Sequence, residues 1–334
     1  MPDQPDPPGG RRSTPATSSE QRGAVITALV ANIVVALAKL ATFLITGSSA
    51  VLAESLHSLA DSTNEVLLLV GARRSSRPAD NRHPFGHARF RYLYAFIVSL
   101  AVFWVGGVLA VFEGISHLAS RGPILDPRWA FGVLGLGAIL DGWSLRTTIR
   151  AGRSAKGALS WKQLVRATKT PELIVVLLED LGALIGIGIA LVGVALTTMT
   201  GDGIWDAVAS IAIGALLMAI GLVVNRETQS LLLGESATEA VIASIRSAIE
   251  TTPGIEGLVD LRTIHLGPDD LVIAVGIVVD PAADATAITR SIDEAKRRTR
   301  NAVPFRTVIY VEPRLAIPDP SPTARPPRGA GPGA

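Results

Sequence analysis

The chain of 334 residues contains no cysteine. A disulfide framework and any metal site built on thiolates are therefore excluded, including copper(I) carriers and Cys-type zinc sites. Charge is also scarce, since 18% of the residues are charged and 48% are hydrophobic. The sequence has no G-x-G-x-x-G, P-loop, G-x-S-x-G or kinase motif. It therefore signals no nucleotide chemistry, no covalent nucleophile and no nucleic-acid partner.

Long apolar runs, broken by short basic connections, account for most of the chain. A run of about 20 apolar residues is long enough to cross a bilayer as a helix. We therefore expect an α-helical polytopic membrane domain over residues 22–233, with six spans near 23–46, 50–72, 91–118, 129–149, 172–199 and 204–225. Residues 1–21 and 314–334 are rich in Pro, Gly, Ser or Thr, and we expect disordered tails there.

The basic residues predict the orientation of these spans. One cluster lies between spans two and three, and comprises Arg73, Arg74, Arg77, Arg82, Arg89 and Arg91. Another lies between spans four and five, and comprises Arg146, Arg150, Arg153, Lys156, Lys162, Arg166 and Lys169. Basic loops stay in the cytoplasm, so we expect both termini to be cytoplasmic and the protein to be a multi-pass protein of the cell membrane.

Residues 234–313 have the composition of a soluble domain. Two amphipathic stretches and three strand-like runs occur in the order αββαβ. This order predicts a small ferredoxin-like α+β domain with both helices on one face of the sheet.

Polar residues form a stripe along the second span. Glu54, His57, Asp61 and Glu65 lie on one helical face. A charged residue at the centre of a spanning helix costs about 2.5–3.5 kcal/mol on insertion scales. The stripe indicates an ion site, in which His57 and Asp61 offer a nitrogen and a carboxylate to one cation. A hydrogen-bonded network that only fixes helix packing is the alternative interpretation.

The fifth span carries the complementary acids Glu172, Glu179 and Asp180. Together with His57 and Asp61 they predict a mixed nitrogen and oxygen ligand set, which suits Zn²⁺ best and admits Co²⁺, Fe²⁺ or Ni²⁺. Other polar residues in the spans receive structural interpretations. We expect Lys39 to extend toward the interface, and Asp141 and Asp206 to lie near span ends, where capping or solvation is favourable. Five motifs carry a family resemblance: HSLAD, RRSSRPADNRHPFGHARFRY, EGISHL, LLLGES and VDLRTIHLGPDDLVIAV.

These motifs, over about residues 22–313, resemble the cation diffusion facilitator family, and most of all its divergent branch that includes the mitochondrial zinc transporter of animals. The resemblance implies a transport site made by an H/D-x-x-x-D pair from each of spans two and five. His57 and Asp61 match the first pair, and Asp180 matches the second acid. Val176 stands where the fourth ligand belongs, and Glu179 is the nearest substitute, with Glu172, Glu54 and a water as the other options.

The resemblance also implies a second metal site at Asp80, His83 and His87 in the turn ADNRHPFGH. The alternative is a loop motif shaped by Pro84 and Gly86. For the cytoplasmic domain the resemblance implies homodimerisation, and His265 is its single histidine, so we expect no metal sensing there.

We therefore expect a homodimeric, proton-coupled antiporter that exports divalent cations by alternating access and has no prosthetic group. Glu54, Glu65 and Glu172 are candidates for a proton or entry path. A non-transporting metal sensor or scaffold and a membrane-embedded metallohydrolase remain as alternatives.

Overall fold

The computed structural model describes residues 18–120, 122–156 and 171–315. Most of the two predicted tails, and the basic residues Lys162, Arg166 and Lys169, lie outside these ranges. The chain divides into two compact units, Met1–Leu232 and Leu233–Ala334.

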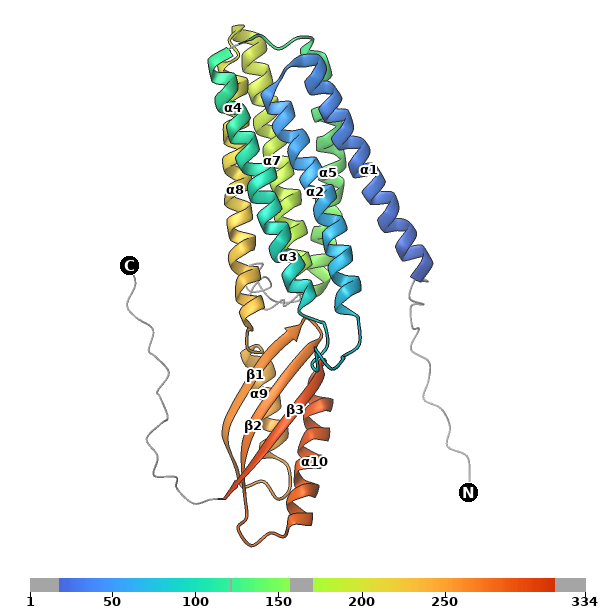
Figure 1. Cartoon of the computed structure of the whole chain (residues 1–334), viewed down its shortest axis with the longest axis vertical. Helices are drawn as coiled ribbons and strands as arrows, with labels where there is room; N and C mark the ends of the chain where they lie inside the picture. The colour runs from blue at the N-terminus through green and yellow to red at the C-terminus, as the bar shows by residue number, and fades with distance from the viewer. Residues whose placement is uncertain (1–17, 121, 157–170, 316–334) are drawn as a thin grey trace, which may run out of the picture. The chain divides into compact units, whose positions relative to one another are not determined.

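The first unit is a bundle of long helices (Figure 1). Its elements are α1 (Ser18–Thr46), α2 (Ser49–Ser75), α3 (Phe90–Ala101), the π-helical segment η1 (Val102–Val108), α4 (Leu109–Ser120), α5 (Pro127–Lys156), α7 (Pro171–Thr200) and α8 (Ile204–Leu233). Each of the six predicted spans coincides with one helix or, for the third, with the continuous run α3, η1 and α4. The helix α1 begins inside the predicted N-terminal tail.

Three stretches of the described residues are long and apolar enough to cross a membrane: Phe90–Ala119, Val175–Thr200 and Ile204–Leu233. A shorter apolar helical stretch covers Asn32–Thr46. The helices α2 and α5 are more polar, and α2 carries the charged stripe. A polar helix is compatible with a membrane domain only when its polar face is covered by other helices or lines a cavity.

The helix α2 contacts helices that are distant in sequence as well as its neighbours α1 and α3. It contacts α1, α3, η1, α4 and α7. Its residues Val51 and Ala53 belong to a buried apolar cluster with Leu134 of α5, Ile187 of α7 and Ile213 of α8. This packing encloses the charged face of α2 between helices.

A buried polar connection joins the start of α2 to α8. Ser48 caps α2, because its hydroxyl accepts a hydrogen bond from the backbone N–H of Val51 at 3.2 Å. Asp206 is 3% exposed and accepts hydrogen bonds from the hydroxyls of Ser48 and Ser49. Asp206 therefore lies near a span end, as expected, and it caps the start of α2, because it also accepts hydrogen bonds from the backbone N–H groups of Ser49 and Ala50. Only the solvation alternative is wrong, since the side chain is buried.

The second unit contains α9 (Glu239–Glu250), β1 (Gly257–Gly267), β2 (Asp270–Val279), α10 (Ala285–Ala302) and β3 (Arg306–Leu315). The sheet order is β1-β2-β3, with β1 antiparallel and β3 parallel to β2. The helix α10 provides the crossover that a parallel pair of strands requires. Both helices pack on each other and on the sheet, around a buried core that includes Ile245, Ile249, Ile273 and Ile277.

Candidate cation site

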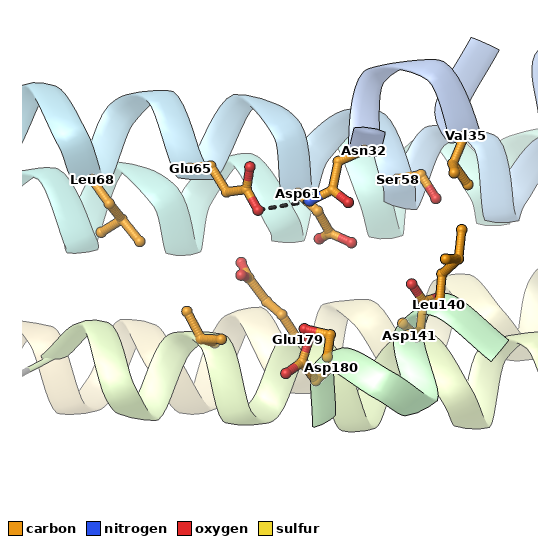
Figure 2. Close-up of a pocket in the computed structure, with 13 residues that line it drawn as sticks. Asn32, Val35, Ser58, Asp61, Glu65, Leu68, Leu140, Asp141, Glu179 and Asp180 are labelled. Atoms are coloured by element: carbon orange, nitrogen blue, oxygen red, sulfur yellow. Dashed lines mark hydrogen bonds between the residues drawn. The ribbon is translucent and has the colours of Figure 1, made fainter. Parts of the chain in front are cut away.

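A cavity of about 110 Å³ lies between α1, α2, α5 and α7. Five carboxylic acids line it: Asp61, Glu65, Asp141, Glu179 and Asp180. Figure 2 shows the two acids of α2 facing the two acids of α7 across this space. One water needs about 10–15 Å³ of such volume, so the cavity has room for a cation with several waters. Five carboxylates in one enclosed space repel one another, and this repulsion favours binding of cations or protons.

His57 and Asp61 are one helical turn apart on α2, and their side chains face each other. His57 is 1% exposed, and neither ring nitrogen has a hydrogen-bond partner. Its Nδ1 lies 3.4 Å from Oδ1 of Asp61, an oxygen that is also buried without a hydrogen bond. Two ligands of a tetrahedral Zn²⁺ at about 2.0–2.1 Å are about 3.3 Å apart. The separation therefore fits two ligands that share one cation.

Asp180 is held in place by α5. The hydroxyls of Ser144 and Thr148 donate hydrogen bonds to its two oxygens, at 2.9 and 2.8 Å. A ligand carboxylate oriented by neighbouring donors is a common feature of metal sites. Its neighbour Glu179 accepts a hydrogen bond from Asn64 of α2 at 2.6 Å. Val176 also lines the cavity, so the position four residues before Asp180 is apolar where the family pattern has a ligand.

Lys39 does not extend to an interface, and that expectation is wrong. It is completely buried, and its ammonium lies 3.1 Å from Oε2 of Glu54, which is also completely buried. Lys39 also donates to Ser58, a cavity-lining residue, at 2.8 Å. In this state of the protein Glu54 is the partner of Lys39, and its role in a proton or entry path stays a prediction.

The other two candidates for that path differ in position. Glu65 lines the cavity and accepts a hydrogen bond from Asn32 of α1 at 2.7 Å. Glu172 is in the first turn of α7, and its side chain lies outside the described part of the structure.

Asp141 was missed as a site residue. It lines the cavity, whereas the sequence interpretation placed it at a span end. Asp141, Ser144 and Thr148 recur at helical spacing on α5, so a polar stripe in this span was the available signal. The stripe is shorter than that of α2 and contains no histidine.

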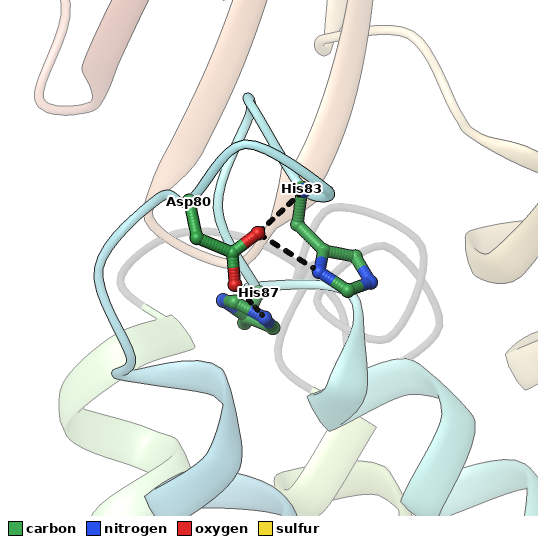
Figure 3. A group of neighbouring side chains, drawn as sticks. All are labelled: Asp80, His83 and His87. Atoms are coloured by element: carbon green, nitrogen blue, oxygen red, sulfur yellow. Dashed lines mark hydrogen bonds and ion pairs between the residues drawn. The ribbon is translucent and has the colours of Figure 1, made fainter.

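The second predicted cluster is assembled by the loop between α2 and α3. Figure 3 shows the carboxylate of Asp80 facing the imidazoles of both His83 and His87. The ligand atoms of these three residues all lie within 4.8 Å of one another. Oδ1 of Asp80 is 3.2 Å from Nδ1 of His83, and its Oδ2 is 3.6 Å from Nε2 of His87. Over the described ranges this is the one group of three such residues that is already this close.

Local hydrogen bonds fix the geometry of this loop. The backbone N–H groups of His83 and Arg82 donate to Asp80 and hold the pKa of this exposed carboxyl below its usual range. The Nδ1 of His87 lies 3.1 Å from the carbonyl oxygen of Pro78, which leaves Nε2 toward Asp80. Gly86 adopts a φ of 81°, so the turn geometry of the alternative interpretation is also present.

The histidine of the second unit has a different setting. His265 is 1% exposed and packs edge-on against Phe305, with a ring-centroid distance of 5.1 Å. It lies in the apolar interior of that unit.

The fold and the candidate site define the class of the protein, a helical membrane domain with a histidine–aspartate pair between its helices, followed by a small α+β domain. The cation efflux transmembrane domain matches residues 25–233, and the cation efflux protein cytoplasmic domain matches residues 237–314. The chain therefore belongs to the cation efflux family. This confirms the family resemblance and the two-part architecture.

Among named relatives, the proton-coupled zinc antiporter SLC30A9, mitochondrial, of Xenopus laevis is 32% identical over 69% of this chain and 41% of its own length. The metal tolerance protein C4 of Arabidopsis thaliana is 26% identical over 73% of this chain and 54% of its own length. The magnetosome protein MamM of Paramagnetospirillum magneticum is 26% identical over 74% of each chain. The chain thus spans about two fifths to one half of the length of the first two relatives.

Proposed function

We propose that this protein exports divalent metal cations, with Zn²⁺ as the main substrate, in exchange for protons. His57, Asp61 and Asp180 bind the cation, and Co²⁺, Fe²⁺ and Ni²⁺ are the other candidate substrates. The observation that carries the proposal is the His57–Asp61 pair, in which two buried ligand atoms lie 3.4 Å apart and neither has a hydrogen bond. Leaving buried polar atoms without partners is unfavourable, unless a ligand satisfies them during the working cycle.

The same atoms provide the coupling. Histidine must be neutral and carboxylates must be ionised to bind a metal, so cation binding releases protons and protonation expels the cation. A site that exchanges the two ligands and faces each side of the membrane in turn performs antiport. An inward proton gradient then drives cations out of the cytoplasm.

The proposal includes a membrane topology and an assembly state. Six spans, with both termini cytoplasmic, place α2 and α5 in the membrane, where α1, α3 and α7 cover their polar faces. The match of the second unit to the cation efflux cytoplasmic domain supports its role as a homodimerisation module.

Zinc uptake by inside-out vesicles that contain the full chain tests this function. We expect an acidic vesicle interior to raise the initial rate of Zn²⁺ uptake several-fold over vesicles without a gradient, and an ionophore that collapses the gradient to remove the increase. Vesicles without the protein are the control. Zinc binding without any uptake would contradict transport and would support the sensor or scaffold alternative. The names of the relatives favour transport over the metallohydrolase alternative.

We further propose that Asp80, His83 and His87 bind a second divalent cation in the loop between α2 and α3. The distances from Asp80 to the two imidazoles, 3.2 and 3.6 Å, are close to the separation of ligands on one Zn²⁺. An exchangeable ion at an exposed loop is suited to regulation, because it does not need to cross the membrane.

Replacing His83 and His87 together with alanine is expected to lower the zinc affinity of this loop at least 10-fold, because both nitrogen ligands are lost. Isothermal titration calorimetry with Zn²⁺ measures the effect on the purified full chain. All variants carry Asp61→Asn, which weakens the cavity site. Affinity in the parent protein is expected to fall as the pH is lowered. Metal ligands must be deprotonated, and the depressed pKa of Asp80 keeps its carboxylate ionised to a lower pH than usual. His117→Ala on α4 is the control. An unchanged affinity in the double variant would leave the motif with a turn-forming role only.

A further inference from the structure

The cavity lacks one ligand of a tetrahedral set. Asp61 and Asp180 line the cavity and supply two, and His57, which is not among the lining residues, supplies a third through its Nδ1, 3.4 Å from Oδ1 of Asp61. Val176 presents only methyl groups at the position of the fourth. A cation with an empty coordination position in a spanning domain keeps a water or recruits another side chain. The neighbouring acids differ in their freedom to fill this position.

Most of those acids already have a partner. Glu179 accepts from Asn64, Glu65 accepts from Asn32, and Glu54 is paired with Lys39. Moving one of these side chains toward a cation would stretch or break the hydrogen bond or ion pair that holds it, and in a low-dielectric interior that loss is unfavourable.

Asp141 of α5 has no such tie. Within the described ranges, no hydrogen bond or ion pair involves its side chain, although it lines the cavity. It lies one turn before Ser144, whose hydroxyl holds Asp180, so α5 turns this face toward the site. The charge of Asp141 acts on both Asp61 and Asp180. Figure 2 places its carboxylate on the same side of the cavity as Asp180.

The site is not yet closed around an ion, because no three ligand atoms of its residues lie within 4.8 Å of one another in the described chain. A bound cation must therefore draw side chains inward. An unbonded aspartate with two side-chain torsions moves with the least loss of other interactions. The buried and unpartnered nitrogens of His57 independently indicate that a cation belongs beside Asp61, at the edge of the cavity.

We propose that the Asp141 carboxylate is the fourth ligand of the transported cation and takes the place that Val176 cannot fill. This inference rests on the proposed function. It makes the site a junction of α2, α5 and α7, with one nitrogen and three carboxylate ligands. Compared with a set of two imidazoles and two carboxylates, this set shifts preference toward oxygen-seeking ions such as Mn²⁺ and Fe²⁺.

A competing role for Asp141 is charge balance. Lys39 lies near the same helix, since a Cβ built on Gly137, one turn before Asp141, would be 3.7 Å from its ammonium. If Asp141 serves only as a counter-charge, its neutralisation affects stability and leaves the affinity and the metal preference of the site unchanged.

Metal binding to the purified full chain separates these roles, in a background in which His83→Ala and His87→Ala silence the loop. Asp141→Asn is expected to lower Zn²⁺ affinity at least 10-fold in titrations, whereas Asp202→Asn, outside the cavity, leaves it unchanged. Asp141→His is expected to retain zinc binding and to raise the ratio of Zn²⁺ to Mn²⁺ affinity at least 10-fold, because it replaces an oxygen ligand with a nitrogen.

Unchanged affinity in Asp141→Asn would overturn the inference. If that variant does not fold, Asp141→His decides, and an unchanged ratio of Zn²⁺ to Mn²⁺ affinity would overturn it as well. His57→Ala in the same background separates this failure from failure of the proposed function. Loss of binding in His57→Ala, with no effect of Asp141→Asn, would refute only the assignment of Asp141 as the fourth ligand. Full binding in both variants would refute the proposed cation site as well.

Discussion

Carriers with His57→Ala are expected to lose zinc flux by more than 100-fold. Groups that merely orient a metal ligand contribute about 10–100-fold to affinity or activity, so removal of a direct ligand is expected to exceed that range. His57 is the one histidine on the polar stripe of α2, and both of its nitrogens are buried without hydrogen bonds. Alanine therefore removes the ligand and its 3.4 Å contact with Asp61 without breaking a hydrogen bond among the described residues.

Initial rates of Zn²⁺ uptake in proteoliposomes, normalised to the amount of folded protein, measure this effect. His117→Ala on α4 makes the same chemical change outside the cavity and is expected to keep the parental rate. His57→Asn keeps a polar side chain and leaves a smaller void than alanine, so it separates loss of the ligand from a loss of flux caused by an internal void. Parental flux in both His57 variants would refute the assignment of His57 as a ligand.

Replacing Lys39 with methionine is expected to destabilise the protein by about 3–5 kcal/mol. Breaking a buried ion pair by removal of one partner leaves an uncompensated charge, and that charge accounts for a cost of this size. Glu54 would then be completely buried without its cation, and its Oε1 already has no hydrogen bond. This carboxylate packs directly against Gly186, where a Cβ would overlap it.

A double-mutant cycle tests this prediction by chemical denaturation of the purified protein. Lys39→Met combined with Glu54→Gln is expected to recover most of the loss, since neither charge remains. Lys296→Met on α10 of the second unit is the control, with an expected change within about 0.5 kcal/mol, as for most surface substitutions. Additive losses in the double variant would mean that the two residues act separately. Proton-coupled flux of the double variant then tests Glu54 as a path residue.

Short-range patterns in the sequence were sufficient to predict the helices and to bring together the first half of the candidate site. The apolar runs define six helices, and each corresponds to a helical stretch of the structure. The i, i+4 spacing of His57 and Asp61 places two ligands on one face of α2 whatever surrounds that helix. The Asp80, His83 and His87 cluster was predictable because its members are close in sequence, with only six residues between Asp80 and His87.

Side-chain partners on different helices were not predictable in this way. Lys39 and Glu54 are 15 residues apart on two helices, and Ser144 and Asp180 are 36 residues apart. Whether such residues meet depends on how the helices are rotated and packed, and the periodicity of a single helix carries no information about this rotation.

By itself, then, the sequence determined that the protein is a helical membrane protein of the cation efflux family with a histidine–aspartate pair in its second span. Only the tertiary structure decided that Lys39 forms an ion pair with Glu54 in the interior, that α5 donates hydrogen bonds to Asp180, and that Asp141 lines the cavity. The physical reason is that local spacing sets which face of a helix is polar, whereas the packing of apolar faces decides which polar faces enclose a common space.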